Sequence, residues 1–448
     1  MLALVHLSTA LLTDHYELTM VDAARRAGTA DRGSVFELFT RRLSGARRYG
    51  VVAGTGRLLE AIDRFRFTDT ELDFLKSRGV VSDGTLDWLA NFRFSGNIWG
   101  YPEGEVFFPG SPLISVEASF AEGVLLETLA LSVLNYDSAV ATAASRMSHA
   151  AKGKPLAEMG SRRTSEYSAV AAARAAYIAG FSATSNLEAG RSYGIPTMGT
   201  AAHSFMLLHD SERAAFEAQI ATLGTDTTLL VDTYDIEQGV RTAIEVAGTS
   251  LGAVRIDSGD LPVVVGRVRH LLDELGATQT RITVTNDLDE HTVAVLAASP
   301  VDSFGVGTSV AVGSGSPTMG MVYKLVAHED EQGNWVSVAK KSAGKVSVGG
   351  RKSVYRRFNA RDVAVAETIV VNDGSHATGL PGNNAAAEAV EGREILVPLV
   401  TNGEVLREHT GTDGIAAARE RHRQRVAELP AVAMSLTRGD PAIPTEYV

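Results

Sequence analysis

The chain has 448 residues, a formal net charge of −11 and no cysteine, and 45% of its residues are hydrophobic. This length is enough for two or three domains with a large core, and the balance of apolar and charged residues is ordinary for globular proteins. The missing cysteine excludes a disulfide scaffold, a thiol nucleophile and a cysteine zinc site, and it fits a cytoplasmic protein. The acidic balance argues against a basic nucleic-acid surface, although a few clustered arginines could still bind a small anion.

The N-terminal segment and the longest apolar tracts do not have the pattern of membrane or export signals. The apolar start lacks a basic segment and is followed at once by Asp14, His15 and Glu17, so we expect a mature N-terminus rather than a signal peptide. The tract 169–183 contains Arg174 and is too short and too rich in alanine to span a bilayer.

Both ends of the chain show strand patterns with a few helical stretches. The first third predicts two helices, over 58–64 and 125–150, and two strands, over 106–108 and 113–117. The last third predicts four strands, over 320–326, 335–339, 345–348 and 353–358. A loop or linker over 373–387 and a final helix over 413–429 follow them.

The middle third alternates short apolar runs with helical patterns. The runs predict strands over 195–198, 228–231, 253–256, 281–285 and 303–306. The helical patterns cover 211–223, 236–247, 261–275 and 290–298. This alternation predicts an α/β fold with a parallel sheet, either open or closed into a barrel.

A polar or glycine-rich signature follows each of these five runs. The signatures are GTAAHS (199–204), DTYD (232–235), DSGDL (257–261), NDLDE (286–290) and GVGTS (305–309). Ligands of parallel α/β folds bind at the carboxyl ends of the strands, so these signatures should converge on one site.

The residue types in these signatures suit a phosphorylated sugar and a second anionic ligand. The N–H groups and hydroxyls of 305–309 can hold a phosphate, and Asp257 can accept two vicinal ribose hydroxyls or hold a metal. Asp232 and Asp235 add further acceptors. Arg162 and Arg163 could grip a carboxylate or a diphosphate with two guanidinium forks.

Each of these residues also has a purely structural interpretation. Asp257 could cap the helix after Leu261, and Asp232 and Asp235 could cap the helix before it. Arg162 and Arg163 could be a solvated pair. His203 could be a satisfied core histidine, but its place behind a strand end and a run of small residues favours a functional role.

The other histidines give little support for a metal site. His209 follows His203 by six residues rather than four, and no nearby carboxylate has the spacing of a zinc site. Three further histidines are expected on helix surfaces: His270, His291 and His422. The chain also lacks a P-loop, so ATP would have to be held in another way.

Taken together, the motifs resemble nicotinate phosphoribosyltransferase, a type II phosphoribosyltransferase of NAD salvage. The resemblance lies in 12–20 (LTDHYELTM), 160–163 (GSRR), 182–190 (SATSNLEAG), 199–204, 255–261, 285–287, 304–309 and 322–325 (VYKL). It implies an irregular α/β barrel and a second, strand-rich α+β domain built from both chain ends. The boundaries that we expect are 1–135, 136–325 and 326–448, with the catalytic barrel in the middle.

The resemblance also implies a reaction and its site residues. Phosphoribosyl is transferred from phosphoribosyl diphosphate to nicotinate, giving nicotinate mononucleotide, with ATP and Mg²⁺ and through phosphorylation of His203. His203 and Asp257 are the catalytic residues that it implies. Tyr16 matches a residue that stacks on the pyridine ring, usually from the partner subunit of a cytoplasmic homodimer. The other substrate-binding residues implied are Arg162, Arg163, Ser204, Asp232, Arg255, Gly259, Asn286, Asp287, Gly305, Gly307 and Thr308.

Three other functions remain open at this point. The chain could be a nicotinamide-type or a quinolinate-type phosphoribosyltransferase, or a non-catalytic regulator that keeps the phosphate cradle. The Asp expected of a nicotinamide enzyme is not evident between Arg163 and Ala201, and quinolinate enzymes are shorter and need no phosphohistidine. ATP hydrolysis stimulated by nicotinate would separate these alternatives.

Overall fold

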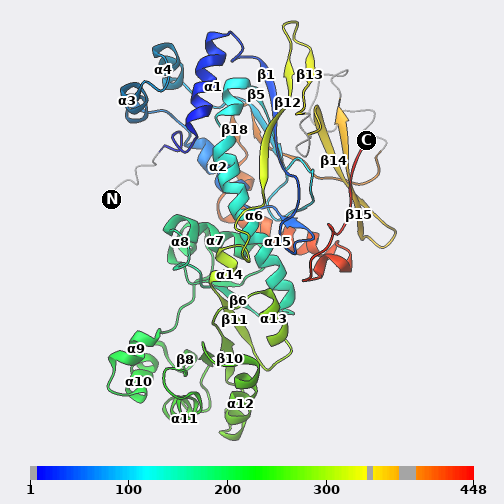
Figure 1. Cartoon of the computed structure of the whole chain (residues 1–448). Coiled ribbons are helices and arrows are strands. Elements are labelled where there is room, and N and C mark those ends of the chain that lie inside the picture. The colour runs from blue at the N-terminus through cyan, green and yellow to red at the C-terminus, as the bar shows by residue number, and fades with distance from the viewer. Residues whose placement is uncertain (1–7, 341–346, 373–389) are drawn as a thin grey trace. The chain divides into compact units, whose positions relative to one another are not determined.

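The computed structural model describes residues 8–340, 347–372 and 390–448 (Figure 1). The chain forms two compact units. Unit 1 combines the described residues of 1–139 and 318–448, and unit 2 is 140–317, all of which is described. Unit 1 is therefore assembled from both ends of the chain, with unit 2 inserted between them.

Unit 2 is built on a six-stranded parallel sheet with the order β7-β6-β11-β10-β9-β8. Its strands are β6 (Leu156–Glu158), β7 (Ala183–Thr184), β8 (Thr228–Leu230), β9 (Ala253–Ile256), β10 (Arg281–Val284) and β11 (Ser303–Val306). The expected parallel α/β arrangement is confirmed. The sheet is open, because β7 and β8 are its two edges.

Helices alternate with these strands. They are α7 (Glu166–Ile178), α8 (Leu187–Tyr193), α9 (His203–Leu208), α10 (Glu212–Leu223), α11 (Ile236–Ala247), α12 (Leu261–Glu274), α13 (Glu290–Leu296) and α14 (Thr308–Ala311). Helix α11 buries Val240, Ala243, Ile244 and Ala247, whose spacing is that of one helix face. Helices α10, α11 and α12 pack side by side (Figure 1).

The strand expected over 195–198 is wrong. This segment makes a single parallel bridge, between Thr197 and Thr184 at the end of β7. Pro196 has no N–H to donate to a ladder, which shortens the pairing. The sequence pattern also missed β6 and β7, because strands of three and two residues are too short to show a period.

The large sheet of unit 1 is antiparallel, and its described strands have the order β13-β12-β1-β5-β3-β17-β18. These strands are β1 (Gly33–Thr40), β3 (Asn97–Gly100), β5 (Ile114–Ser119), β12 (Met321–Glu329), β13 (Trp335–Ser337), β17 (Val397–Thr401) and β18 (Glu404–Val405). In the register of β1 with its neighbours, Phe36 lies opposite Val116 on β5 and Leu325 on β12. Residues from both chain ends thus complete one sheet and its core.

Two smaller sheets complete the strands described in unit 1. Their strands are β2 (Gly50–Val51) with β4 (Val106–Phe107), and β14 (Arg351–Phe358), β15 (Ala364–Asn372), β16 (Arg393–Glu394) and β19 (Thr445–Tyr447). Strands β4, β5, β12, β13 and β14 correspond to expected strands. Residues 347–348 are not in a strand, and the rest of the strand expected over 345–348 lies outside the described residues, as does the loop expected over 373–387.

Two helices of unit 1, α6 and α15, lie within about two residues of the helices that the sequence predicts over 125–150 and 413–429. The described helices are α1 (His15–Arg26), α2 (Thr55–Asp63), α3 (Asp69–Arg78), α4 (Asp83–Ala90), α5 (Phe120–Val124), α6 (Glu127–Ala150), α15 (Gly411–Ala427), η1 (Arg407–His409) and η2 (Ala431–Met434). Helix α6 begins in unit 1 and ends in unit 2. The helical stretch 120–150 is long and apolar enough to cross a membrane, but 67% of its apolar window is buried inside the protein, as in a core helix.

The expectation for His422 is wrong, because its side chain is buried. It shares one face of α15 with Ile415 and Ala418, which are also buried. Burial, together with the charge of Arg419, lowers the pKa of His422 to about 4. The expectation for His270 is right, since its side chain is 77% exposed beside Glu274.

Candidate active site

The polar residues expected at the site follow the carboxyl ends of neighbouring strands in unit 2. In sheet order, these segments are 160–163 after β6, 307–308 after β11, 286–287 after β10, 257–259 after β9 and Asp232 after β8. Parallel strands present their carboxyl ends at one edge, so the five segments share that edge. Because β9 lies between β8 and β10 in the sheet, segment 257–259 lies between Asp232 and segment 286–287 along this edge.

Asp232 joins His203 to the loop after β9. Its Oδ1 lies 3.2 Å from Nε2 of His203, and its Oδ2 accepts hydrogen bonds from the N–H of Asp257 (2.9 Å) and the hydroxyl of Ser258 (2.6 Å). The Asp232 side chain is fully buried. It does not cap α11, because that position is filled by Asp235, whose carboxylate accepts from the N–H of Gln238.

His203 is the first residue of α9, and its side chain is 41% exposed, so it is not a core histidine. A carboxylate can only accept, so the contact with Asp232 requires a proton on Nε2. A neutral ring then keeps its lone pair on Nδ1. Gly199 stands in the preceding loop, where an added Cβ would meet open space. The geometry suits a nucleophilic imidazole that is oriented by a carboxylate.

Asp257 has partners that the helix-cap interpretation does not require. The hydroxyl of Thr285, at the end of β10, donates to Oδ1 of Asp257, while the N-cap of α12 is Asp260. Asp257 is partly exposed, and Gly259 two residues later has a left-handed φ of 88°, which favours glycine. The Asp257 carboxylate is thus fixed by β10 and remains accessible to a ligand.

Three arginines lie at this edge. Arg255, on β9, donates to the hydroxyl of Thr200 over 2.8 Å. Burial lowers its pKa, the charge of Arg162 lowers it further, and Asp257 and Asp232 act in the opposite direction. Arg162 is therefore near enough to Arg255 to share one electrostatic field with both aspartates. The side chains of Arg162 and Arg163 are exposed.

Gly160, after β6, and Gly305, in β11, allow the segments around these two neighbouring strands to approach each other closely. A Cβ at Gly305 would lie 2.6 Å from both Sδ of Met159 and Cγ2 of Thr285. A Cβ at Gly160 would lie 2.8 Å from Oε1 of Glu158. Burial raises the pKa of Glu158, whose carboxylate accepts hydrogen bonds from the N–H of Gly160 and from Thr184. Gly307 and Thr308 follow β11 and are partly exposed.

Asn286 has an unusual backbone conformation for a residue with a side chain. Its φ is 98°, and its Oδ1 accepts a hydrogen bond from the N–H of Asp287 over 2.9 Å. Such a conformation costs about 1 to 3 kcal/mol and is found mostly at functional sites. Asn286 and Asp287 are both exposed at the edge.

Glu212, in the first turn of α10, was not predicted as a site residue. Burial, followed by the charges of Asp232 and Asp235, raises its pKa to about 7. Within the described residues, its Oε1 is a buried atom without a hydrogen-bond partner. The sequence gives no signal that Glu212 is buried beside Asp232 and Asp235, because a glutamate after a serine cap is common at helix starts.

Two further residues that the sequence predicts, Ser204 and Tyr16, are both exposed. Ser204 follows His203 on α9 and is exposed. Tyr16 is on α1 of unit 1, and its ring is 45% exposed. Burial, followed by the charges of Glu127, Glu17 and Asp14, raises the pKa of Tyr16 to about 12.

Residues 8–340, 347–372 and 390–448 contain no group of three or more histidine, aspartate or glutamate side chains that could hold a metal ion alone. Mg²⁺ often needs only one or two carboxylates, because substrate phosphates and water complete its coordination. Asp257 and Asp287 at the sheet edge fit this arrangement.

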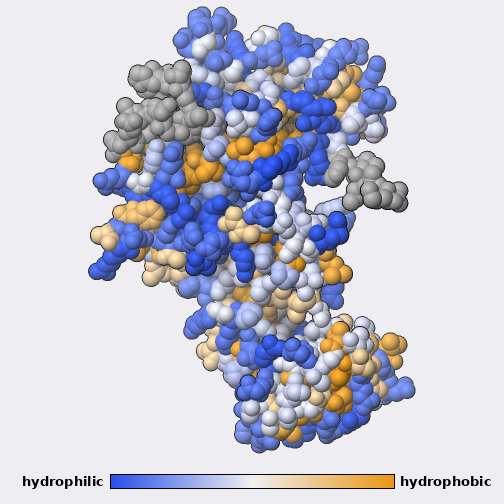
Figure 2. Space-filling model, turned by 180° about the vertical axis from the view of Figure 1, so that it is seen from behind, coloured by the Kyte–Doolittle hydropathy of each residue, from blue (hydrophilic) through white to orange (hydrophobic). Residues whose placement is uncertain are grey.

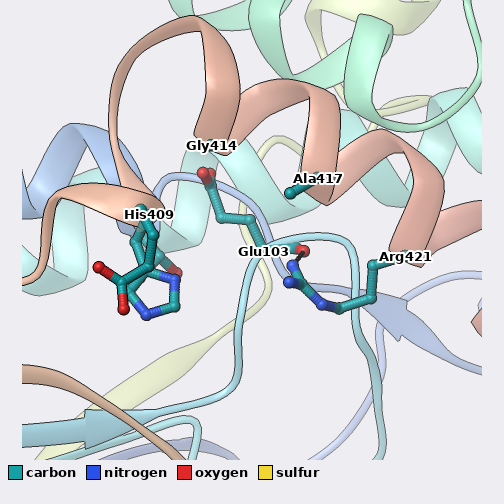
Figure 3. Close-up of a pocket in the computed structure, with 7 residues that line it drawn as sticks. Glu103, His409, Gly414, Ala417 and Arg421 are labelled. Carbon is teal, nitrogen blue, oxygen red and sulfur yellow. Dashed lines mark hydrogen bonds between the residues drawn. The ribbon is translucent and has the colours of Figure 1, made fainter.

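Among the cavities in the described part of unit 1, two are lined by charged residues. One, of about 10 Å³, lies beside α15 and has room for about one water molecule (Figure 3). Arg421 points toward Glu103 there and donates to its main-chain oxygen over 2.5 Å. The other cavity, of about 290 Å³, is lined partly by the buried ion pair of Lys352 and Glu37 (2.6 Å).

The surface seen in Figure 2 is mostly hydrophilic with small hydrophobic patches. Leu207 and Leu208, which follow His203 on α9, are 64% and 77% exposed. Scattered exposed apolar residues of this kind are normal for folded proteins.

Comparisons with known proteins show which family the chain is similar to. Residues 11–135 match the N-terminal domain of nicotinate phosphoribosyltransferase, and residues 155–368 match the nicotinate phosphoribosyltransferase family. A nicotinate phosphoribosyltransferase of Mycobacterium tuberculosis is 52% identical over 98% of this chain and 95% of its own length. That of Bacillus subtilis is 38% identical over 79% of this chain and 74% of its own length.

A solved structure supports the same fold. The crystal structure of human nicotinic acid phosphoribosyltransferase superposes with a TM-score of 0.79, covering 98% of this chain and 97% of that one at 24% identity. The two family matches together span more than half of the sequence, and the identity to the mycobacterial enzyme extends over nearly all of it. The chain therefore belongs to the nicotinate phosphoribosyltransferase family.

Proposed function

We propose that this protein transfers phosphoribosyl from phosphoribosyl diphosphate to nicotinate, gives nicotinate mononucleotide and diphosphate, and couples this transfer to ATP hydrolysis through phosphorylated His203. Asp232 carries the proposal, because its two oxygens contact His203 and the N–H of Asp257. A change of charge on the imidazole therefore acts directly on the loop proposed to hold the ribose.

The sugar end of the reaction is assigned to the loops after β9, β10 and β11. The Asp257 carboxylate accepts hydrogen bonds from the ribose hydroxyls and stabilises positive charge that develops on the sugar as the bond from C1 to diphosphate breaks. The N–H groups of 305–308, with Asn286 and Asp287, hold the 5-phosphate. The close packing of Gly305 against Met159 and Thr285 supports this assignment, because it keeps the loop rigid.

The base is assigned to the arginine side of the site. Nicotinate differs from nicotinamide in its carboxylate, which the Arg162 guanidinium can bind by charge-assisted hydrogen bonds. Arg163 and Arg255 add positive charge for the carboxylate and the diphosphate. In a homodimer of the family type, Tyr16 of a second copy would stack on the pyridine ring.

The energy-coupling step is assigned to Nδ1 of His203. Its lone pair attacks the γ-phosphorus of ATP, the bond to the β,γ-bridging oxygen breaks, and ADP leaves. Asp232 holds the Nε2 proton and stabilises the positive charge on the ring. Water later takes the phosphoryl group, which restores the histidine and releases phosphate.

Mg²⁺ would be held by Asp257 or Asp287 together with substrate phosphates, and it would supply positive charge to the leaving diphosphate. The arginines remain responsible for orienting that group.

The test is a product assay with the purified full chain. Nicotinate, nicotinamide and quinolinate are each supplied with phosphoribosyl diphosphate, with and without ATP, and the nucleotide product and ADP are quantified. Of the three bases, we expect only nicotinate to give a nucleotide product, which is nicotinate mononucleotide. We also expect ADP formation to rise when nicotinate is added. Product from nicotinamide or quinolinate at an equal rate, or none from nicotinate, would refute the proposal.

A further inference from the structure

The turn that carries Arg162 and Arg163 is held by other segments of unit 2. It follows β6 and is closed by the N–H of Arg163, which donates to the main-chain oxygen of Gly160 over 2.8 Å. The turn packs against the loop after β11, since a Cβ added at Gly160 would lie 2.9 Å from the main-chain oxygen of Gly307. It also contacts Asn186, the N-cap of α8. The position of the turn is therefore set by its neighbours in the fold.

A closed ring of hydrogen bonds runs from the turn to Asn186 and back. Nδ2 of Asn186 donates to Oγ of Ser161 over 3.0 Å, and the N–H of Asn186 donates to Oγ1 of Thr184 over 3.0 Å. The Thr184 hydroxyl donates to Oε2 of Glu158 over 2.6 Å, and Oε1 of Glu158 accepts from the N–H of Gly160, the residue before Ser161. Glu158 and Thr184 are also paired in the ladder of β6 and β7, so the ring is anchored on the sheet.

Asn186 is the member of this ring whose chemistry is most specific. Its Oδ1 accepts a hydrogen bond from the N–H of Ala189 over 2.9 Å, as the N-cap of α8. That hydrogen bond fixes the orientation of the amide, so its nitrogen faces the turn and acts as a donor. Aspartate and serine cap helices as well as asparagine does, but aspartate has no side-chain donor and the serine side chain is shorter. Helix capping alone therefore does not require asparagine at this position, whereas the contact with Ser161 does.

The position of this turn matters for ligand recognition because the side chains of Arg162 and Arg163 are exposed. The core does not orient exposed side chains, so their direction depends on the backbone that carries them. A guanidinium group binds a carboxylate through two parallel N–H groups, which requires a defined angle of approach. A mobile turn would have to be ordered when the ligand binds, and that ordering weakens binding.

We propose that Asn186 is a positioning residue for nicotinate recognition, whose amide holds the turn so that Arg162 meets the carboxylate of the base. This inference rests on the proposed function, in which Arg162 binds that carboxylate. Asn186 acts through the turn rather than by contact with the base. Loss of its donor weakens binding in the ground state and in the transition state alike, so the KM for nicotinate rises while kcat stays nearly unchanged.

The first test measures nicotinate kinetics of the full-length chain with Asn186→Ser, Ser161→Ala and the double variant. Asn186→Ser keeps an oxygen that caps α8 but removes the donor to Ser161. Each single change should raise the KM about threefold to tenfold, the usual cost of ordering one side chain, with kcat nearly unchanged. The double variant should be no worse than either single one, because all three lack the same hydrogen bond. Additive effects, or an unchanged KM in Asn186→Ser, would overturn the inference.

The second test determines whether the effect passes through Arg162. In an Arg162→Ala background, Asn186→Ser should cause no further rise in the KM for nicotinate, since the turn no longer carries the group that binds the carboxylate. A further rise as large as in the parent would show a general effect on the fold and would overturn the inference. Ser161→Thr keeps the hydroxyl that accepts the hydrogen bond, so its KM should be near normal. A KM as high as that of Ser161→Ala would count against the positioning role.

The matched control is Ser192→Ala, which removes an exposed hydroxyl of α8 that donates to Glu188 over 2.7 Å. Its KM for nicotinate should stay at the parent value. If the parent protein makes no nicotinate mononucleotide, the proposed function fails and the positioning role fails with it. If the parent is active and Arg162→Ala raises the KM but Asn186→Ser does not, only the positioning role fails.

Discussion

Asp232 and Asp257 follow the neighbouring strands β8 and β9, and the N–H of Asp257 donates to Oδ2 of Asp232 over 2.9 Å. The other oxygen of Asp232 contacts His203. Two proposed roles, phosphoryl acceptance and ribose binding, therefore depend on one buried carboxylate. Removing its charge should affect both, whereas removing either ligand-facing group should affect one.

The first prediction concerns this shared carboxylate. Asp232→Asn should reduce phosphorylation of His203 by ATP at least about tenfold, because a neutral amide stabilises the charged ring less well by about 1.4 kcal/mol or more. The measurement is acid-labile, base-stable label from γ-labelled ATP, with His203→Ala as the blank. Asp235→Asn is the matched control, since asparagine caps a helix as well as aspartate does. Equal labelling of parent and Asp232→Asn would contradict the assignment.

The second prediction concerns the sugar. Asp257→Asn keeps the shape of the side chain but removes charge that opposes a developing cation, so kcat should fall about 100-fold or more. The free energy of unfolding, measured by thermal unfolding, should remain within about 1 kcal/mol of the parent value, the usual range for a polar substitution at a partly exposed position. Asp260→Asn, at the exposed N-cap of α12, should leave kcat unchanged. Normal turnover of Asp257→Asn would refute its catalytic role.

The third prediction concerns recognition of the base. Arg162→Ala should raise the KM for nicotinate about tenfold or more, because a charge-assisted hydrogen bond worth about 2 kcal/mol is lost. Steady-state kinetics with nicotinate as the varied substrate measures this effect. Arg191→Ala removes an exposed arginine that pairs with Glu188, and it should have no effect. A KM unchanged by Arg162→Ala would assign carboxylate recognition to another residue.

The fourth prediction compares two glycines. Gly305→Ala should destabilise the protein by about 1 to 3 kcal/mol, since the new methyl group would overlap Met159 and Thr285. Thr285 holds Asp257, so kcat should fall as well. Gly266→Ala, inside α12 with open space around its Cβ, should instead stabilise by about 0.5 to 1 kcal/mol. Urea unfolding measures both changes, and equal effects of the two would contradict the packing described.

The fifth prediction concerns pH and the buried His422, whose pKa is lowered from 6.5 to about 4. As the pH falls below 6.5, the unfolded chain binds a proton at this histidine before the folded protein does. Its contribution to stability is complete above pH 6.5 and is lost progressively down to pH 4, a loss of about 3 kcal/mol.

This loss should be visible as the difference in free energy of unfolding between the parent and His422→Leu, measured by urea at several pH values. The leucine variant should show a flatter dependence between pH 6.5 and 4. His270→Leu, at an exposed position, should keep the dependence of the parent. Parallel pH curves for the parent and His422→Leu would refute the burial effect.

The sequence predicted the parts of the fold that depend on local pattern. Strands β9 and β11 and helix α11 have the expected bounds, because apolar runs and helical spacing are strong there. Strands β6 and β7 were missed because they owe their place to neighbours in the sheet rather than to their own composition. His422 was misplaced because its helix has a weak apolar stripe on the buried side.

The site was predictable as a set of segments but not as a set of contacts. The polar signatures contained Asp232, Asp257 and His203, and the parallel sheet explains why the segments of Asp232 and Asp257 share one edge. The segment of His203 does not follow a strand of this sheet, because 195–198 makes only a single bridge. The hydrogen bond from Asp257 to Asp232 depends on the order of β8 and β9 in the sheet. Glu212 was missed because its raised pKa arises from burial and from charges on other segments.

The insertion of unit 2 within unit 1 has a consequence for synthesis on the ribosome. Strand β1 pairs with β12, so Phe36 must wait for Leu325 before this ladder can form. Unit 2 is continuous and can complete its parallel sheet earlier, since its strands lie within 140–317. The nascent chain therefore carries an unfinished sheet edge at β1 throughout the translation of unit 2, and an exposed edge of this kind is a site for chaperone binding or aggregation.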